Sequence, residues 1–321
     1  MTNLNVTIEE FIEDACEGIR MEAAGRSVLC ALSGGIDSAV CAVLGHRAVG
    51  DKLTCIFVDT GFMRKGEGDQ VAALFQGAYS INLIRVDAEE RFLAKLSGVT
   101  DPEIKRKTIG GEFIRVFEEE AKKLGEVSCL LQGTIYPDVM ESGDDGYAQV
   151  KAHHNVGGMP LNMEFDTVIE PIRILFKEEV RECGRRLGLP EAFVSRQPFP
   201  GPGLAVRCLG ELTKPRLDML READAIFREE IERAGLHKEI QHYAVILPNI
   251  WTVGVRGGAR SYEETAVLRA MTTKNFVTAD YVRLPYDLID TVTQRITTEV
   301  PGINRLAYDT TPKPPATMEW Q

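Results

Sequence analysis

The sequence predicts an open, mostly parallel α/β sheet with helices on both faces, followed by a smaller α+β domain. Two near-continuous apolar runs, residues 27–32 and 53–58, have the character of parallel strands that are covered on both faces. Residues 37–49 between them have helical spacing, which gives a strand–helix–strand unit. A stretch rich in proline and glycine later ends this alternation. These observations divide the chain into a first domain at 1–196 and a second at 197–321.

The rest of the first domain continues the alternation of strands and helices. An amphipathic helix is expected at 6–24, ahead of the first strand. Further strands are expected at 81–86 and 127–132, and further helices at 68–77, 88–96 and 111–124. Open sheets of this kind bind ligands at the carboxyl ends of their strands, where Ser33, Asp59 and Gly133 fall.

The second domain begins after a stiff connection in which Pro198, Pro200 and Pro202 alternate with glycines. A long amphipathic helix is expected at 213–234, then strands at 242–248 and 251–256, a helix near 262–271 and a tail. Because the strand–helix–strand order is lost, this part is predicted to be α+β. Its apolar strands favour a homodimer formed through this domain.

Composition excludes several classes of function. The net charge of -11 argues against a protein that binds nucleic acid or an anionic membrane, so an anionic ligand needs a local basic cluster. No apolar stretch reaches the about 20 residues of a membrane span, and the first residues do not resemble a signal peptide. The seven cysteines are scattered, which is typical of buried, reduced thiols in a cytoplasmic protein.

The first apolar strand runs into a glycine turn that opens a helix. The candidate phosphate-binding residues there are Ser33, Gly34, Gly35, Ile36, Asp37, Ser38 and Ala39. This is neither a Walker loop nor a G-x-G-x-x-G fingerprint. The glycines let amides face an anion, and the helix amino terminus adds partial positive charge. Asp37 would repel a bare phosphate, so it indicates a cation such as Mg²⁺. Alternatively, Asp37 is an ordinary N-cap in a plain turn.

The pattern Ser-Gly-Gly-x-Asp-Ser after a buried strand resembles the pyrophosphate loop of the N-type ATP pyrophosphatases. The resemblance implies an adenine-nucleotide alpha hydrolase-like fold and cleavage of ATP between its α and β phosphates. It also implies that residues 33–39 contact ATP and that Asp37 binds Mg²⁺ and acts in catalysis. The loop alone does not choose between GMP synthetases, NAD synthetases, asparagine synthetases, argininosuccinate synthetases and the tRNA thiolases.

Further segments of the first domain are similar to GMP synthetases. Residues 53–67 resemble their second strand and turn, and Val58 falls where that family places adenine. Residues 101–113 resemble part of the family's lid, expected at about 100–125. A basic cluster at 105–107 opens a helix, where cations are poorly placed for the helix dipole. The resemblance assigns Arg106 to the substrate; otherwise these three residues form a solvated face.

Two more segments bear on the ATP site. Residues 130–142 match a family segment near the ribose and the metal, with Gly133 for close backbone approach and Thr134 as a hydroxyl donor. A tight turn capped by Asp138 is the alternative. Lys177 begins a predicted helix and is similar to a family lysine that reaches the pyrophosphate, which makes it a second catalytic candidate. The alternative is a lone surface lysine.

His153 and His154 are adjacent in the sequence. On a strand their side chains would point to opposite faces, so a single metal ion held by both is not expected. They are interpreted as loop packing or as groups that position a substrate.

The second domain carries the segments that are most specific to GMP synthetases, at 196–207 and 308–321. By this resemblance Lys313 meets the phosphate of XMP, Thr317 and main-chain amides hold its oxygens, and Glu319 accepts from a purine N–H. The alternative is a disordered tail.

The sequence departs from the family pattern at two positions. Gly258 stands where a turn of the family pattern has an aspartate. Arg260 of the same turn, which the resemblance also implies to bind XMP, is retained. A contact from position 258 to the substrate is therefore in doubt. Gln321 stands where the family usually has glutamate, and we expect little effect from that change.

The resemblance covers essentially the whole chain, which is identified as the ATP pyrophosphatase part of a GMP synthetase. It implies a cytoplasmic ligase of purine biosynthesis that makes GMP from XMP, ATP and ammonia. Adenylyl-XMP is the implied intermediate, and AMP and pyrophosphate are the other products. Too few residues precede Ser33 for a glutaminase domain, so a separate glutaminase subunit is expected.

Two functions from other classes remain open. A tRNA thiolase-like enzyme would adenylylate a base with the same loop, but it predicts a broad basic surface and often a catalytic cysteine pair. A non-catalytic subunit that senses nucleotides would bind ATP without releasing pyrophosphate.

Overall fold

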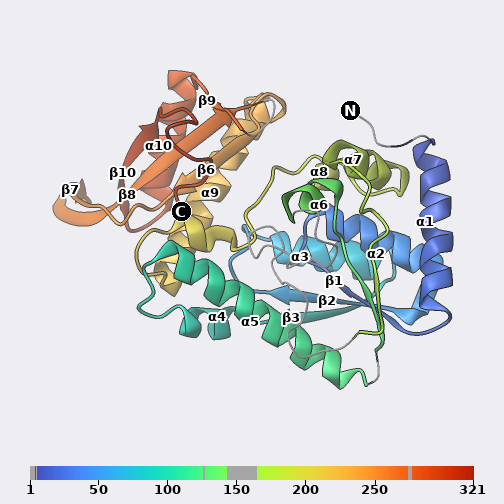
Figure 1. The fold of residues 1–321 in the computed structure, drawn as a ribbon. Coiled ribbons are helices and arrows are strands. Elements are labelled where there is room, and N and C mark those ends of the chain that lie inside the picture. Colours follow the sequence, from blue (N-terminus) through green and yellow to red (C-terminus); the bar gives the residue numbers. More distant parts are fainter. Residues whose placement is uncertain (1–3, 5, 126, 143–164, 274–276) are drawn as a thin grey trace. The chain divides into compact units, whose positions relative to one another are not determined.

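The computed structural model describes residues 4, 6–125, 127–142, 165–273 and 277–321, and these form two compact units (Figure 1). Unit 1 contains Met1–Gly61, Gly66–Glu89 and Ile109–Arg196, and unit 2 contains Phe62–Lys65, Glu90–Thr108 and Gln197–Gln321. The main boundary falls between residues 196 and 197, as in the sequence-based division. Two short segments from the first 196 residues nevertheless belong to unit 2.

Unit 1 is built on a five-stranded parallel sheet, which confirms the predicted fold class. Its order is β3-β2-β1-β4-β5. The strands are β1 (Val28–Ala31), β2 (Leu53–Asp59), β3 (Asn82–Asp87), β4 (Cys129–Leu131) and β5 (Thr167–Ile169). The helical elements are α1 (Ile8–Ala23), α2 (Ile36–Val49), η1 (Gly50–Lys52), α3 (Glu67–Ala72), the π-helix η2 (Ala73–Ala78), α6 (Tyr136–Ser142), α7 (Lys177–Arg186) and α8 (Glu191–Val194).

The strand order places helices on both faces of this sheet. From β1 to β3 the chain moves in one direction across the sheet, and from β3 to β4 it returns past β1. Right-handed connections therefore put α2 and α3 on one face and α5 (Pro102–Lys123) on the other, as Figure 1 shows. The order reverses between β1 and β4, so their carboxyl ends are where an open sheet binds ligands.

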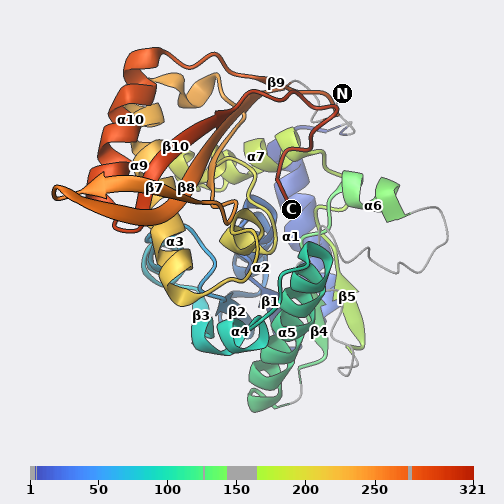
Figure 2. The same ribbon diagram turned by 90° about the vertical axis from the view of Figure 1, so that its left-hand side faces the viewer.

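Unit 2 contains a second five-stranded sheet, in which the long strand β8 (Ala259–Thr272) pairs with all the others. These are β6 (His242–Ile246), β7 (Trp251–Arg256), β9 (Asp280–Tyr281) and β10 (Ile303–Asp309); only β10 runs parallel to β8. The helices of this part of the chain are α4 (Glu89–Lys95), η3 (Gly203–Arg207), α9 (Lys214–Arg233), η4 (Leu236–Lys238) and α10 (Tyr286–Glu299). Figure 2 shows α9 and α10 next to the sheet.

The prediction of a helix near 262–271 is wrong, because these residues form most of β8. Residues 264–271 are all buried, so the strand lacks the alternation of polar and apolar residues that marks a half-buried strand. Arg216 of α9 binds Glu264 on one face of β8, and Arg269 binds the carboxyl-terminal tail on the other. Cover on both faces therefore overrides the helical propensity of the Glu, Ala, Leu and Met residues.

Gly203 is a packing constraint on unit 2. Its φ is +64°, and an added Cβ would lie 2.3 Å from the main-chain oxygen of Phe62. We predict that Gly203→Ala lowers the free energy of unfolding by at least about 3 kcal/mol, through left-handed strain together with the clash. The measurement is urea denaturation followed by tryptophan fluorescence, since both tryptophans, Trp251 and Trp320, lie in unit 2.

Gly235 provides the matched control for this prediction. Its φ is +72°, but an added Cβ would meet nothing within 4 Å. Gly235→Ala should therefore cost only the backbone strain, about 1 kcal/mol. Equal denaturation midpoints for the two variants would show that the contact with Phe62 is not a constraint.

Candidate functional site

The glycine turn after β1 is organised by its two serine hydroxyls. The Ser33 N–H donates to Ser38 Oγ at 3.2 Å, and Ser38 Oγ donates to the carbonyl of Gly35 at 3.1 Å. The two hydroxyl oxygens are 3.0 Å apart. Gly34 has a φ of +81°, which explains the need for glycine there.

Helix α2 begins directly after this turn, with Gly35 as its N-cap. The first amides of a helix have no intrahelical acceptor, so those of Ile36, Asp37 and Ser38 can donate to an anion. Ala39, in contrast, donates to the carbonyl of Gly35 at 3.1 Å. The turn therefore provides an anion-binding amino terminus without any cation of its own.

Asp37 and Lys177 form an ion pair at the beginning of α2. The Lys177 Nζ lies 2.6 Å from Asp37 Oδ2, and both side chains remain partly exposed. Gly184 allows α7, which Lys177 begins, to pack against α2, since an added Cβ would lie 3.2 Å from Ile36 Cδ1. The N-cap alternative for Asp37 is wrong, because Gly35 occupies that position. Lys177 is therefore not a lone lysine, although 37% of its side chain is exposed.

The second oxygen of Asp37 is suited to a metal ion. Oδ1 is buried and has no hydrogen-bond partner in the described part of the chain. In that same part, no cluster of three or more histidine, cysteine, aspartate or glutamate side chains could hold a metal by itself. A single carboxylate oxygen nevertheless fits Mg²⁺, which proteins commonly bind through one or two carboxylates together with substrate phosphates.

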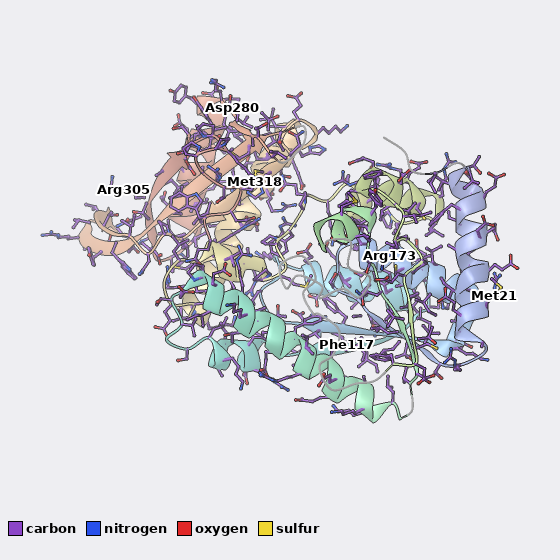
Figure 3. All side chains as sticks on the ribbon, viewed as in Figure 1. Met21, Phe117, Arg173, Asp280, Arg305 and Met318 are labelled. Atoms are coloured by element: carbon purple, nitrogen blue, oxygen red, sulfur yellow. The ribbon has the colours of Figure 1, made fainter. Side chains whose placement is uncertain are left out.

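The segment after β4 approaches the same turn. An added Cβ on Gly133 would lie 3.1 Å from the main-chain nitrogen of Ser38, so glycine permits this close approach. The Thr134 hydroxyl accepts from Gln132 Nε2 at 3.1 Å and donates to Glu170, which also binds Arg173, labelled in Figure 3. Residues 33–39, Gly133 and Lys177 are thus brought together.

Two neighbouring predictions have different outcomes. Asp138 Oδ2 accepts a hydrogen bond from the Ile135 N–H at 3.0 Å. This contact agrees with the alternative in which Asp138 caps a tight turn. Val58 is 4% exposed near the end of β2, opposite Val86 of β3, and its assignment to adenine stays a prediction. His153 and His154 lie outside the described residues.

In unit 2 the carboxyl-terminal tail is packed and hydrogen-bonded, so the disordered alternative is wrong. Lys313 pairs with Ala279 through two main-chain hydrogen bonds of 2.8 and 2.9 Å. The fully buried Arg269 donates to the carbonyls of Thr317 at 2.6 Å and of Met318 at 3.1 Å. Met318 is labelled in Figure 3. These contacts fix the backbone of the tail.

Glu319 is the tail residue with the strongest side-chain contact. Arg207 Nε donates to Glu319 Oε2 at 3.0 Å, and Arg207 Nη2 donates to Oε1 at 2.8 Å. Burial by itself would raise the pKa of Glu319, but the Arg207 guanidinium outweighs burial and lowers that pKa to about 2. The carboxylate is therefore ionised and acts only as an acceptor.

His242 lies beside this ion pair. Its Nε2 is 3.9 Å from Glu319 Oε1, and it is buried without a hydrogen-bond partner among the described residues. Burial lowers the pKa of His242 to about 4; the nearby Glu319 opposes this shift and Arg207 adds to it. His242 is therefore neutral near pH 7.

The basic cluster at 105–107 is not one surface. Lys105 is fully buried, its Nζ donates to the carbonyl of Cys208 at 2.6 Å, and burial lowers its pKa to about 8. Arg106 donates to the main-chain oxygen of Gln321, and Lys107 is exposed. The interpretation of three cations acting together is therefore wrong for Lys105, since successive helical residues point in different directions.

Arg260 lies on the hairpin of β7 and β8, away from the tail in sequence. It is exposed and stands opposite Val255 in the strand register. Gly257 and Gly258 connect the two strands with φ of +59° and +80°, as a type I′ turn requires. Gly258 therefore has a structural role in the turn, whatever the family aspartate does at that position.

Sequence reasoning missed Arg207 and Arg269, the two buried arginines that hold the tail. A signal was present, because each stands alone as a cation within an apolar run. An arginine is rarely buried unless it is paired, so such a position predicts a buried partner. The partner itself could not be read from the sequence.

Comparison with known proteins shows which proteins this chain is similar to. A model described as the GMP synthase C terminal domain matches residues 229–320. GMP synthase [glutamine-hydrolyzing] of Ruminiclostridium cellulolyticum is 58% identical over 98% of this chain and 61% of that protein. The enzyme of Acetivibrio thermocellus is 60% identical over 97% of this chain and 61% of that protein. Over almost its whole length, the chain is similar to GMP synthases. It spans about three fifths of the length of these GMP synthases.

Solved structures with a similar fold include NMN synthetase from Francisella tularensis, with a TM-score of 0.47 and 18% identity. That match covers 63% of this chain and 79% of the other. The NH3-dependent NAD synthetase from Campylobacter jejuni matches with a TM-score of 0.45 and 16% identity, over 71% and 88%. The fold assignment rests on the sheet topology and not on these scores.

The neutral, buried His242 predicts a pH dependence of stability. Its folded pKa of about 4 lies below the ordinary value of 6.5, so the unfolded chain binds the proton more tightly. The free energy of unfolding should therefore fall as the pH drops from 6.5 towards 4, by up to about 3 kcal/mol. Glu319 adds its own loss only below its ordinary pKa of 4.5, as the pH falls towards about 2.

The check is a series of urea denaturation curves between pH 7 and pH 4.5, within the range where His242 dominates this pair. His242→Gln should flatten the dependence, whereas the exposed control His237→Gln should leave it unchanged. The same slope in wild type and His242→Gln would refute the assignment.

Proposed function

We propose that this chain is the ATP pyrophosphatase part of a GMP synthase and makes GMP from XMP, ATP and ammonia. The observation that carries the proposal is the pairing of an anion-binding turn with Asp37 and Lys177 in unit 1. The packed tail with Lys313, Thr317 and Glu319 in unit 2 supports XMP as the second substrate. The similarity to GMP synthases agrees with both.

The proposed reaction has two steps. The C2 oxygen of XMP attacks the α-phosphorus of ATP, which forms adenylyl-XMP and breaks the bond to pyrophosphate. Ammonia then attacks C2, the bond from C2 to oxygen breaks, AMP leaves and the excess proton passes to solvent. Because the xanthine oxygen is a poor leaving group, adenylylation is needed before ammonia can displace it.

In this proposal the side chains and amides bind and orient rather than form a covalent intermediate. The amides at the beginning of α2, with Ser33 and Ser38, hold the departing pyrophosphate. Lys177 supplies the cation that the turn lacks. We propose Asp37 as the protein ligand of Mg²⁺, which when bound would neutralise charge on the phosphates. Val58 and Thr134 are proposed to contact ATP, and Arg106 and Arg260 to contact XMP.

The rival functions have less support. A tRNA thiolase would use a reactive cysteine, yet all seven cysteines are free and buried. Burial raises the pKa of Cys183 to about 12 and that of Cys208 to about 11, which leaves little thiolate at pH 7. A sensing subunit has no need of the Asp37–Lys177 pair. Unpaired thiols also fit the proposed cytoplasmic location.

We further propose that a separate glutaminase subunit supplies the ammonia. The related enzymes are described as glutamine-hydrolysing, but the buried cysteines here are unsuited to a glutaminase nucleophile. Co-purification of the chain with a candidate glutaminase, with and without XMP and ATP, tests this association.

The proposed homodimer uses the hairpin of β7 and β8. Trp251, Val253 and Val255 lie on one face of β7, with Tyr262 opposite Val253, and all four are exposed. The Trp251 and Tyr262 rings are 6.0 Å apart. An exposed apolar face next to a sheet edge marks an interaction surface, and a second copy can match it about a twofold axis. No described helix is long and apolar enough to span a membrane.

The activity is tested by incubating the chain with ATP, XMP, MgCl₂ and an ammonium salt. AMP, pyrophosphate and GMP should form in equal amounts. A folded sample that binds ATP but forms neither AMP nor GMP would contradict the proposed function.

Asp37→Asn should lower kcat for AMP formation by about 10²- to 10³-fold, since the charge that balances the metal is lost while the shape is kept. Asp51→Asn, at an exposed position in η1, is the matched control and should retain full activity. Thermal melting should be similar for both variants. Near-normal turnover by Asp37→Asn would remove the metal assignment.

Val255→Glu combined with Tyr262→Glu should weaken the dimer by at least about thirtyfold, which is the scale of a single interface hot spot. The measurement is light scattering across a concentration series. Met21→Glu is the control, because Met21 is similarly exposed but lies on α1 (Figure 3). A monomeric wild type, or a double variant that stays dimeric, would contradict the assignment.

A further inference from the structure

The proline- and glycine-rich motif at 196–207 holds no substrate group in the proposed function, yet its second half is buried. The Leu204 N–H donates to the carbonyl of Phe62 at 2.8 Å, and residues 203–207 are all buried. The Phe199 ring lies 4.2 Å from the Arg64 guanidinium carbon and 5.1 Å from that of Arg207. The motif therefore places Arg207 in the interior of unit 2 on a hydrogen-bonded backbone.

Arg207 belongs to a charge-balanced cluster. Its Nη1 is 3.6 Å from Asp224 Oδ1, while its Nε and Nη2 bind Glu319. Arg64 Nε lies 3.9 Å from Asp224 Oδ2. Arg64, Arg207 and Asp224 each have less than a tenth of their side chain exposed. Two guanidinium groups thus face two carboxylates.

A gain in stability does not by itself explain why such a cluster of charges is buried. Desolvation of buried ion pairs often cancels their attraction, so stability alone does not require charged residues at these positions. What the ion pair provides is a direction, because the guanidinium fork fixes the plane of a carboxylate. An ionised carboxylate has about four acceptor positions, and the fork uses two of them. Glu319 keeps 17% of its side chain exposed for further donors.

We propose that Arg207 is a positioning residue, which fixes the Glu319 carboxylate so that its remaining acceptor positions meet the N–H groups of the purine base. This role rests on the proposed function, in which the tail binds XMP. Asp224 contacts both Arg64 and Arg207, so the motif at 196–207 supports the tail that is proposed to bind the substrate. A purely structural Arg207 would instead anchor the tail without affecting recognition of the base.

The test is steady-state kinetics of GMP formation with the full chain and an ammonium salt, for Arg207→Lys, Arg207→Met, Glu319→Gln and the double variant Arg207→Met/Glu319→Gln. Arg207→Lys should raise KM for XMP about tenfold, because one of two charge-assisted hydrogen bonds is lost. KM for ATP should change less than about twofold, within the error of such comparisons. Arg283→Met, at an exposed arginine paired with Asp280, is the control.

The double variant separates positioning from anchoring. Once Glu319 is neutral, Arg207 has no charge to orient, so the double variant should be no worse for XMP than Glu319→Gln alone. If Arg207→Met does not fold, Arg207→Lys and the double variant still decide the matter, because neither leaves the Glu319 carboxylate buried without a cation.

The outcomes are distinguishable. Equal increases of both KM values, multiplied effects in the double variant, or a normal KM for XMP in Arg207→Lys would each overturn the positioning role and leave the proposed function intact. A folded wild type that makes no GMP would overturn the proposed function, and the positioning role with it.

Discussion

The bidentate ion pair between Arg207 and Glu319 is the interaction on which the carboxyl-terminal tail depends. It joins the end of the chain to a segment more than a hundred positions earlier, at donor–acceptor distances of 3.0 and 2.8 Å. Arg269 adds a second fixation through the carbonyls of Thr317 and Met318. Side chains that are proposed to bind a substrate can stand on such a tail only because its backbone is held from inside the domain.

Both arginines lie in a sheet domain whose central strand is covered on its two faces. Without the tail, Arg269 would keep its ion pair with Asp309 of β10 but lose the carbonyl acceptors of Thr317 and Met318, and buried N–H groups without acceptors are destabilising. The tail is therefore part of the folded domain as well as a candidate substrate site. Stability and the proposed recognition of the substrate depend on the same contacts, and His242, next to Glu319, is expected to make this stability depend on pH.

The candidate phosphate-binding turn in unit 1 is organised differently from the carboxyl-terminal tail. Main-chain amides and two serine hydroxyls shape it, and these groups need no desolvated charge. The charges come from Asp37 on α2 and from Lys177 on α7, which the packing of the two helices brings within 2.6 Å. A preformed neutral turn with a partly exposed pair of opposite charges beside it would suit the proposed ligand, whose charge changes as pyrophosphate departs.

The sequence by itself determined the parallel sheet and the position of the glycine turn between β1 and α2, whose phosphate-binding role stays a prediction. These features are local: apolar runs mark buried strands, and a glycine turn at a strand end needs only its own residues. The role of β8 was decided by the tertiary structure, because burial on both faces removed the period on which a strand prediction depends. Likewise, only the structure separated Lys105, buried against the carbonyl of Cys208, from the exposed Lys107. The pairing of Arg207 with Glu319 was likewise visible only in the structure. The partner of a buried charge is set by the path of the chain through space and not by the residues that neighbour the charge in the sequence.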